Sequence, residues 1–377
     1  MSTEQGPSWR PAGILRDIVK EKEMAMALYE NTLSTRPDHP LNLRLAFAAP
    51  AGSARLARAM RDAADAGHLC VVAEIKGFQN LGNIPRPRER LSVGELEGLV
   101  DASYETPQML ATELAAGGVD AFLVASDAAR YGGSLDAVKL VSKQLRKSGT
   151  ERGPPVIRHD FIIHPIQIAE AAENGATAVN IVAGACLIDL EELLTSATMM
   201  GIEAVVECHT EIERDLALEA GAAIIMLSNY DRSIGQLVRG RAEQLVSEIP
   251  EFVQTLAYGG ITTATDAWRY MDMGFDGVVI GTSLLKSRRR TDFVRELKSE
   301  KRVARSSMFG NFGYDNSRMS SKAFDVARSE MEASAAVNDD QILKEIENEL
   351  MSITDEHERR TVEAWLADYR RSAANPQ

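Results

Sequence analysis

Short apolar runs alternate with helix-like segments along most of this chain. At five places a helix-like segment ends in a glycine that an apolar run follows directly; these glycines are Gly118, Gly175, Gly201, Gly221 and Gly274. Glycine readily takes the left-handed conformation that ends many helices. Further strands are predicted at Cys70–Ile75, Pro155–Ile157 and Gln254–Ala257, which makes eight strand–helix units.

The eight units predict an α/β fold. Continuous apolar strands that alternate with helices are typical of a parallel sheet covered on its outer face. Eight units over residues 69–286 match a closed (β/α)8 TIM barrel. An open doubly wound sheet is the alternative. Its nucleotide-binding version is disfavoured, because no Gly-x-Gly-x-x-Gly follows the first strand.

Two helical extensions flank the predicted barrel. In residues 1–68, the apolar spacing predicts an amphipathic helix over Ile14–Tyr29, a Pro/Asn-rich link over Arg36–Asn42 and a second helix over Ala51–Ala66. Residues 287–377 combine a basic helix-like start, a loop with three aromatic residues and a long charged helical stretch. We expect this C-terminal extension either to pack on the barrel or to bind a protein partner.

The composition excludes several classes of function. Asp and Glu number 55 against 42 Lys and Arg, and the net charge of −13 argues against nucleic acid as a partner. No apolar run approaches the roughly 18 residues that a membrane span needs, so we expect a soluble protein, of the cytoplasm or the plastid stroma. The three cysteines lie in apolar runs, which predicts buried thiols in a reducing compartment. Their spacing is not that of metal ligands, and we expect neither a metal nor a cofactor.

Candidate chemistry begins at the end of the first predicted strand, where Glu74 and Lys76 follow an apolar run. Residues two apart on a strand share a face, so both side chains project together. They form either a structural ion pair or part of a ligand site, because a buried carboxylate and a buried ammonium must pair or meet a ligand. Ligands of such barrels bind at the carboxyl ends of the strands. The polar and glycine residues at the other strand ends are Ser126, Asp127, Arg158, His159, Asn180, Glu207, His209, Ser228, Asn229, Tyr258, Gly260, Gly281 and Thr282.

Several segments resemble the indole-3-glycerol phosphate synthase family, over about residues 10–286. The N-terminal segment is most similar to plant and algal members. The order and spacing of the matching segments carry the resemblance. They are Pro11–Val19, Ala73–Lys76, Tyr131–Ser134, Pro155–Ile163, Pro165–Ile168, Val206–His209 and Val279–Ser283.

The resemblance implies closure of an indole ring from a carboxyphenylamino-deoxyribulose phosphate, with loss of carbon dioxide and water. Such a reaction needs a general acid and a base, a cation for the substrate carboxylate and backbone amides for the phosphate. By resemblance, Lys76 meets that carboxylate or donates a proton beside Glu74, and Glu207 is the second acid–base carboxylate. The candidate ligand-binding residues are Asn180, Ser228 and Asn229, together with Gly260, Gly281 and Thr282 at the phosphate.

The chain departs from the family pattern at several of these places. The family's strand-3 lysine, its main general acid, is His159 here, which is shorter and less often charged. The Ser-Pro-Ser segment after the strand-1 lysine is replaced by Gly77–Gly82, and Asn180 replaces an aliphatic residue. The strand-6 pattern Asn-Asn/Ser-Arg-Asp reads Ser228–Asp231, without the first amide and the arginine. The strand-7 pattern Glu-Ser-Gly reads Tyr258–Gly260, without the carboxylate and the hydroxyl.

These losses predict a diverged paralogue with weak or lost ring-closing activity that still binds a phosphorylated ligand, because catalytic groups that act as a unit fail together. His159 is then either a replacement acid or a polar filler. Two alternatives stay open: a non-catalytic assembly subunit that binds a protein partner through residues 287–377, and an active synthase of tryptophan biosynthesis. We expect His209 to pair with Glu207 or to contact a ligand, and Asp127 and His164 to have structural roles at helix starts.

Overall fold

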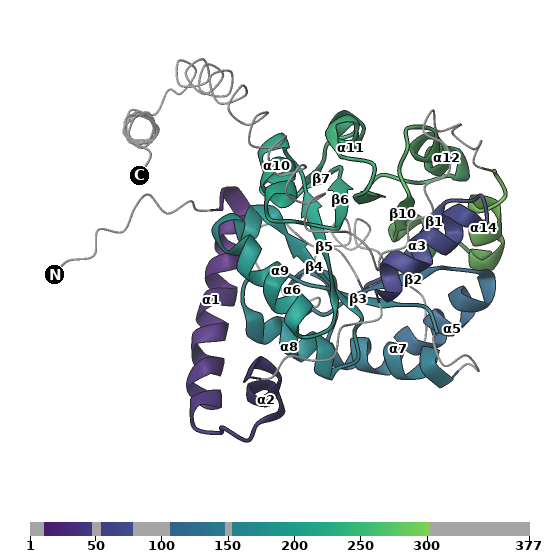
Figure 1. Ribbon diagram of the computed structural model, residues 1–377. Helices are drawn as coiled ribbons and strands as arrows, with labels where there is room; N and C mark the ends of the chain where they lie inside the picture. The colour runs from purple at the N-terminus through teal and green to yellow at the C-terminus, as the bar shows by residue number, and fades with distance from the viewer. Residues whose placement is uncertain (1–10, 47–53, 78–105, 148–152, 302–377) are drawn as a thin grey trace, which may run out of the picture. The chain divides into compact units, whose positions relative to one another are not determined.

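The computed structural model describes residues 11–46, 54–77, 106–147 and 153–301. Eight parallel strands close into a barrel in the order β1-β10-β9-β6-β5-β4-β3-β2 (Figure 1). Their bounds are β1 Cys70–Ile75, β2 Ala121–Ala125, β3 Val156–His159, β4 Ala178–Val182, β5 Glu203–Cys208, β6 Ile224–Ser228, β9 Gln254–Tyr258 and β10 Gly277–Ile280. The predicted (β/α)8 TIM barrel is therefore confirmed.

Helices lie on the outside of the barrel between successive strands (Figure 1). They are α5 Pro107–Gly117, α6 Ala128–Tyr131, α7 Leu135–Lys147, α8 Pro165–Glu173, α9 Leu190–Met199, α10 Glu211–Glu219, α11 Arg241–Leu245, α12 Ala264–Asp272 and α13 Thr282–Lys286, with short 3-10 turns at Ala183–Ala185, Leu187–Asp189 and Val246–Glu248. The five glycines that the sequence pattern marked as helix ends all have positive φ, between 72° and 101°. The pattern thus predicted these helix ends correctly.

Alternation along each strand separates two apolar layers. In β1, Val71, Ala73 and Ile75 pack outward against the helices, whereas Cys70 and Val72 belong to the cluster inside the barrel. Because this alternation continues along the strand, Glu74 points into the barrel at its carboxyl end. All three cysteines are buried free thiols.

Helix α3 (Arg55–Asp65) packs against the interior cluster at the amino ends of the strands. Its Leu56 and Met60 are fully buried there. The residue before the helix, Ala54, offers no capping side chain. Instead, the carboxylate of Glu203, at the start of β5, accepts hydrogen bonds from the backbone N–H groups of Leu56 (2.6 Å) and Ala57 (2.9 Å). A carboxylate from a distant strand therefore caps this helix.

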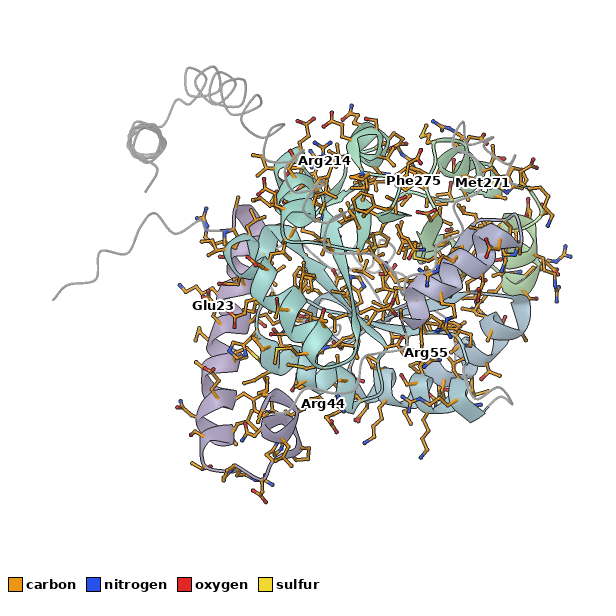
Figure 2. The ribbon with its side chains drawn as sticks, viewed as in Figure 1. Glu23, Arg44, Arg55, Arg214, Met271 and Phe275 are labelled. Atoms are coloured by element: carbon orange, nitrogen blue, oxygen red, sulfur yellow. The ribbon has the colours of Figure 1, made fainter. Side chains whose placement is uncertain are left out.

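The amino-terminal helix α1 (Gly13–Ser34) packs on the opposite end of the barrel. Its Leu15 and Ile18 contact a cluster that includes Tyr131 and Phe161. The expected link over Arg36–Asn42 contains the start of a further helix, α2 (Pro40–Ala46). Proline suits the first helical position, and α2 is anchored on α8 by Arg44, whose Nε lies 2.5 Å from Glu173 Oε1 (Figure 2).

The last described helix, α14 (Arg290–Leu297), packs on α5 and α12. Trp268 of α12 donates a hydrogen bond from its indole N–H to Leu297 O (3.1 Å). The boundary at Lys286 stays a prediction. Residues 302–377, with the expected aromatic loop and charged helix, lie outside the described residues, as does most of Gly77–Gly82. Among the described helices, none is long and apolar enough to cross a membrane.

Candidate functional site

Four residues that the sequence marked as catalytic candidates meet at the carboxyl ends of the strands. Glu74 and Lys76 stand at the end of β1, His159 ends β3, and Glu207 lies near the end of β5. Each of the four is at most 3% exposed. Together with Tyr131, Asn180, Arg232 and Tyr258 they form one network of contacts, which we call the central cluster.

Glu74 and Lys76 form a buried ion pair, with 2.6 Å between Lys76 Nζ and Glu74 Oε2. Tyr258 donates a hydrogen bond to the other carboxylate oxygen (2.9 Å), and His159 Nδ1 lies 3.4 Å from it. Burial by itself would raise the pKa of Glu74, but Lys76 and His159 outweigh it and lower that pKa to about 2. Burial also lowers the pKa of Lys76, which Glu74 offsets in part.

Glu207 is the most heavily bonded carboxylate of the cluster. Arg232 donates to it from Nε (2.7 Å) and Nη2 (3.1 Å), and Asn180 Nδ2 donates at 2.8 Å. His209 Nε2 lies 3.2 Å away. Burial would raise the pKa of Glu207, yet Arg232 and His209 hold it well below its usual value. At neutral pH Glu207 is therefore an ionised acceptor whose oxygens are already engaged.

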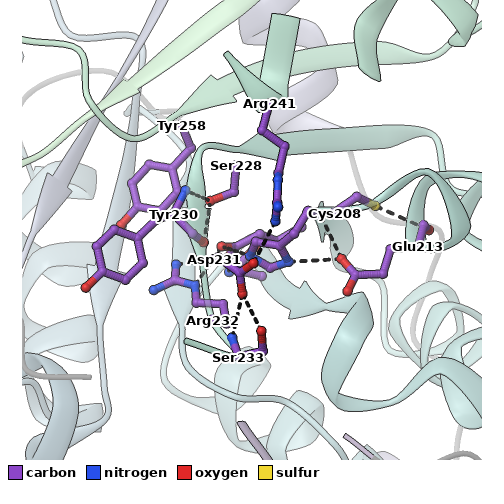
Figure 3. A network of polar contacts seen from close by, with 12 residues as sticks. Cys208, Glu213, Ser228, Tyr230, Asp231, Arg232, Ser233, Arg241 and Tyr258 are labelled. Atoms are coloured by element: carbon purple, nitrogen blue, oxygen red, sulfur yellow. Dashed lines mark hydrogen bonds and ion pairs between the residues drawn. The ribbon is translucent and has the colours of Figure 1, made fainter. Parts of the chain in front are cut away.

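Arg232 is a charged residue of the central cluster that the sequence did not mark. It directly follows the segment Ser228–Asp231 that was compared with the family's strand-6 pattern. It lies on a hairpin formed by β7 (Tyr230–Asp231) and β8 (Gln236–Leu237), which the apolar pattern did not predict. Its side chain is fully buried, and Nη1 donates to the Tyr131 hydroxyl at 2.6 Å. A guanidinium thus occupies the centre of the cluster, close to Tyr230 and Tyr258 (Figure 3).

His209 joins the central cluster to α10. Its Nδ1 lies 2.9 Å from Glu213 Oε2 and its Nε2 faces Glu207, so the expected pairing with Glu207 is confirmed. Burial by itself would lower the pKa of His209, but the two carboxylates outweigh it and raise that pKa to about 9. The imidazole is therefore positively charged at neutral pH.

Ser228 and Asn229 are not brought into the central cluster. The Ser228 hydroxyl accepts from the backbone N–H of Tyr230 (3.0 Å). Asn229 donates to the Tyr270 hydroxyl (2.7 Å) and accepts from the backbone N–H of Ala242 (2.9 Å), so its side chain ties the end of β6 to α11 and α12. A cavity of about 290 Å³ lies beside this contact, and its lining includes Arg239, Glu243, Gly260, Arg269 and Tyr270.

The candidate phosphate glycines follow β9 and β10. Gly260 has φ +78°, a left-handed conformation. Gly281 directly precedes α13, whose first residue is Thr282. A Cβ on Gly281 would overlap Glu74 Oε2 and lie 3.0 Å from Glu74 Cδ. Only a glycine leaves room there for the Glu74 carboxylate in its present position.

We expect Gly281→Ala to destabilise the protein by about 1–3 kcal/mol, the usual effect of an added methyl group in a packed interior. The methyl group would push the Glu74 carboxylate away from Lys76. Urea unfolding of the variant and the wild type measures the change. Equal free energies of unfolding would contradict this account of the Gly281–Glu74 contact.

A second ion cluster, beside the first, ties α1 to the barrel. Asp160 accepts from Lys22 of α1 (2.6 Å), from Arg158 (2.9 Å) and from Ser126 (2.5 Å), and Lys22 also pairs with Asp127 (2.9 Å). Burial would raise the pKa of Asp160, but Arg158 and Lys22 hold it well below its usual value. Sequence reasoning missed Lys22, because it lies on a helix that reads as amphipathic.

Two expected structural roles are confirmed. Asp127 is the N-cap of α6 and accepts from the backbone N–H of Arg130 at 2.7 Å. His164 is the N-cap of α8, and its ring accepts from the backbone N–H of Ile166 at 3.2 Å. In both cases a side chain satisfies a backbone donor that the helix leaves free.

Comparisons with known proteins agree with the barrel and with the matching segments. A family model described as "Indole-3-glycerol phosphate synthase" matches residues 97–297. The indole-3-glycerol phosphate synthase of Opitutus terrae is 31% identical over 222 residues, which are 59% of this chain and 77% of that protein. The enzyme of the same name from Haloarcula marismortui is 33% identical over 237 residues, or 62% and 78% of the two chains.

A third relative, from Mycolicibacterium gilvum, is 28% identical over 276 residues, which are 73% of this chain and 87% of that protein. It carries the same name as the other two. The resemblance inferred from the sequence motifs is thus confirmed at the level of the family, and the likeness to plant and algal members stays a prediction. The chain belongs to the indole-3-glycerol phosphate synthase family.

Proposed function

We propose that this chain is a diverged member of its family, in which ring closure is weak or lost and a phosphorylated ligand still binds. The observation that carries the proposal is the contact between Arg232 and Glu207. Both oxygens of Glu207 accept from the guanidinium, and both side chains are fully buried. A carboxylate in this state neither donates a proton at neutral pH nor exchanges partners without breaking a buried ion pair.

The other candidate groups support the same proposal. Lys76 is paired with Glu74 at 2.6 Å, so the ammonium that would meet the substrate carboxylate already has a counter-ion. His159 stands where the resemblance expects a lysine as the general acid. Its ring packs on Tyr131, with 4.4 Å between the ring centroids, which suits a polar filler better than a mobile proton donor.

Support for a phosphorylated ligand is separate from these losses. Gly260, Gly281 and Thr282 follow the seventh and eighth strands of the barrel, where such barrels frequently bind phosphate. Backbone amides at this place recognise phosphate without a particular side chain. Binding can therefore persist after the acid–base groups have changed.

The test is indole formation from the carboxyphenylamino-deoxyribulose phosphate, followed by product fluorescence. Loss of a positioned general acid commonly slows a reaction by about 10²–10⁴-fold. We expect this protein to be at least about 100-fold slower than the Opitutus terrae relative, and we expect His159→Asn to leave the residual rate unchanged. Turnover comparable with the relative, abolished by His159→Asn, would overturn the proposal. Calorimetry with the same compound measures the binding that we expect to remain.

A further inference from the structure

The surroundings of Arg232 have the chemistry of a guanidinium site. Three tyrosine rings surround the group, with their centroids 5.7 Å (Tyr131), 5.5 Å (Tyr230) and 5.4 Å (Tyr258) from Arg232 Cζ. Aromatic faces attract cations, most strongly where water is excluded. The carboxylate of Glu207 lies against the edge of the guanidinium in a two-point contact.

The protein atoms around the group are mainly acceptors. The Tyr131 hydroxyl accepts from Nη1, and His159 Nε2 lies 3.4 Å from Nη2. Asn180 Oδ1 is buried in the same cluster and has no hydrogen-bond partner among the described residues. A site built from carboxylate, hydroxyl, amide oxygen and ring faces selects a cation that donates hydrogen bonds, not an anion.

The cation comes from a hairpin that lies outside the barrel sheet. Ser233 and Asp231 hold the hairpin by contacts outside the central cluster, to the backbone N–H of Ile14 (2.8 Å) and to Arg241 (2.7 Å). Ile234 at its turn is 50% exposed, whereas the Arg232 side chain is fully buried. The hairpin therefore has an exposed turn, and it contributes both the Arg232 guanidinium and one ring of the cage, Tyr230.

We propose that Tyr131, Tyr258 and Glu207 of the barrel, with Tyr230 of the hairpin, form a guanidinium-binding site, and that Arg232 occupies it as a tethered ligand. With Arg232 in place, a ligand entering from the strand ends does not reach Glu207. When the Arg232 side chain leaves the cage, the site accepts an organic cation of guanidinium type. The inference concerns binding alone, so it stands or falls independently of any ring-closing activity.

The test removes the tether and supplies the free group. In Arg232→Ala, Glu207 keeps Asn180 and the charged His209 as partners, so its charge is not left alone. We expect guanidinium chloride at a few millimolar, far below denaturing concentrations, to raise the Tm of this variant saturably by about 2–4 °C. Urea, which is similar in shape but neutral, is the matched probe and should give no rise at the same concentrations.

Two further variants define the site. Arg232→Ala combined with Glu207→Gln lacks the carboxylate and should not respond to guanidinium. Arg214→Ala removes another buried arginine, which lies on α10 (Figure 2) and pairs with Asp215 (2.7 Å) and Glu248 (2.8 Å), neither of which belongs to the cage; it should not respond either. If Arg232→Ala folds poorly, its refolding yield with guanidinium against urea gives the same comparison. The proposal is overturned if the Tm of Arg232→Ala does not rise with guanidinium, or if it rises equally with urea. It is also overturned if the Tm of Arg214→Ala rises with guanidinium by the same amount.

Discussion

Glu207→Gln is expected to lower the free energy of unfolding by about 3–5 kcal/mol, the range for breaking one side of a buried ion pair. The substitution is nearly isosteric, so the loss arises from charge rather than from packing. Arg232 is fully buried, and among the described residues Glu207 is the only carboxylate within ion-pair distance of it. His209 loses one of its two carboxylate partners at the same time.

A double-mutant cycle separates this electrostatic effect from others. Arg232→Met alone should destabilise less than Glu207→Gln, because Glu207 still has Asn180 and His209. In the double variant no buried guanidinium is left unpaired, and replacing both members of such a pair is often nearly neutral. We therefore expect the double variant to be more stable than Glu207→Gln alone. The free energies of unfolding are measured with urea and are compared only if the m-values are unchanged. If the losses of the two single variants add up in the double variant, the two side chains are not coupled, and the Arg232–Glu207 ion pair is contradicted.

Much of the fold was predictable because each unit carries its own local signals. A glycine of positive φ ends the helix, and the apolar run after it becomes a strand that is buried on both faces. The short helix α2 escaped prediction for the opposite reason. It has seven residues and one buried apolar side chain, Leu41, which is too little to establish a helical period.

In the candidate site too, the residues with a local periodic signal were predictable and the others were not. Glu74 and Glu207 lie on strands, where a period of two fixes the direction of a side chain, so the sequence predicted that they face the interior. Arg232 lies on a hairpin, where no periodicity specifies the direction of a side chain. Lys22 pairs with Asp160 across 138 positions of the sequence, a contact that no local pattern encodes. Charged residues on the hairpin and on α1 were therefore the part that sequence reasoning missed.

The stability of the protein is expected to fall as the pH rises from about 6.5 to 9, because the unfolded chain loses the His209 proton in this range while the folded protein still holds it. The pKa of His209 is about 9 in the folded protein against an ordinary value of 6.5. The folded state thus binds the proton more tightly than the unfolded chain. The resulting stabilisation is complete below the unfolded pKa and is lost as the pH rises through the folded pKa. It amounts to roughly 3 kcal/mol, at about 1.36 kcal/mol for each pKa unit.

Urea unfolding of the wild type and of His209→Gln, at several pH values across this range, isolates the contribution of His209. Glutamine has no charge to lose, so the difference between the two proteins should be large near pH 6.5 and small above pH 9. Other titrating groups, such as Lys76 with its lowered pKa, contribute to both proteins and largely cancel in the difference. Parallel pH profiles would mean that the imidazole between Glu207 and Glu213 is not the charged form that these contacts require.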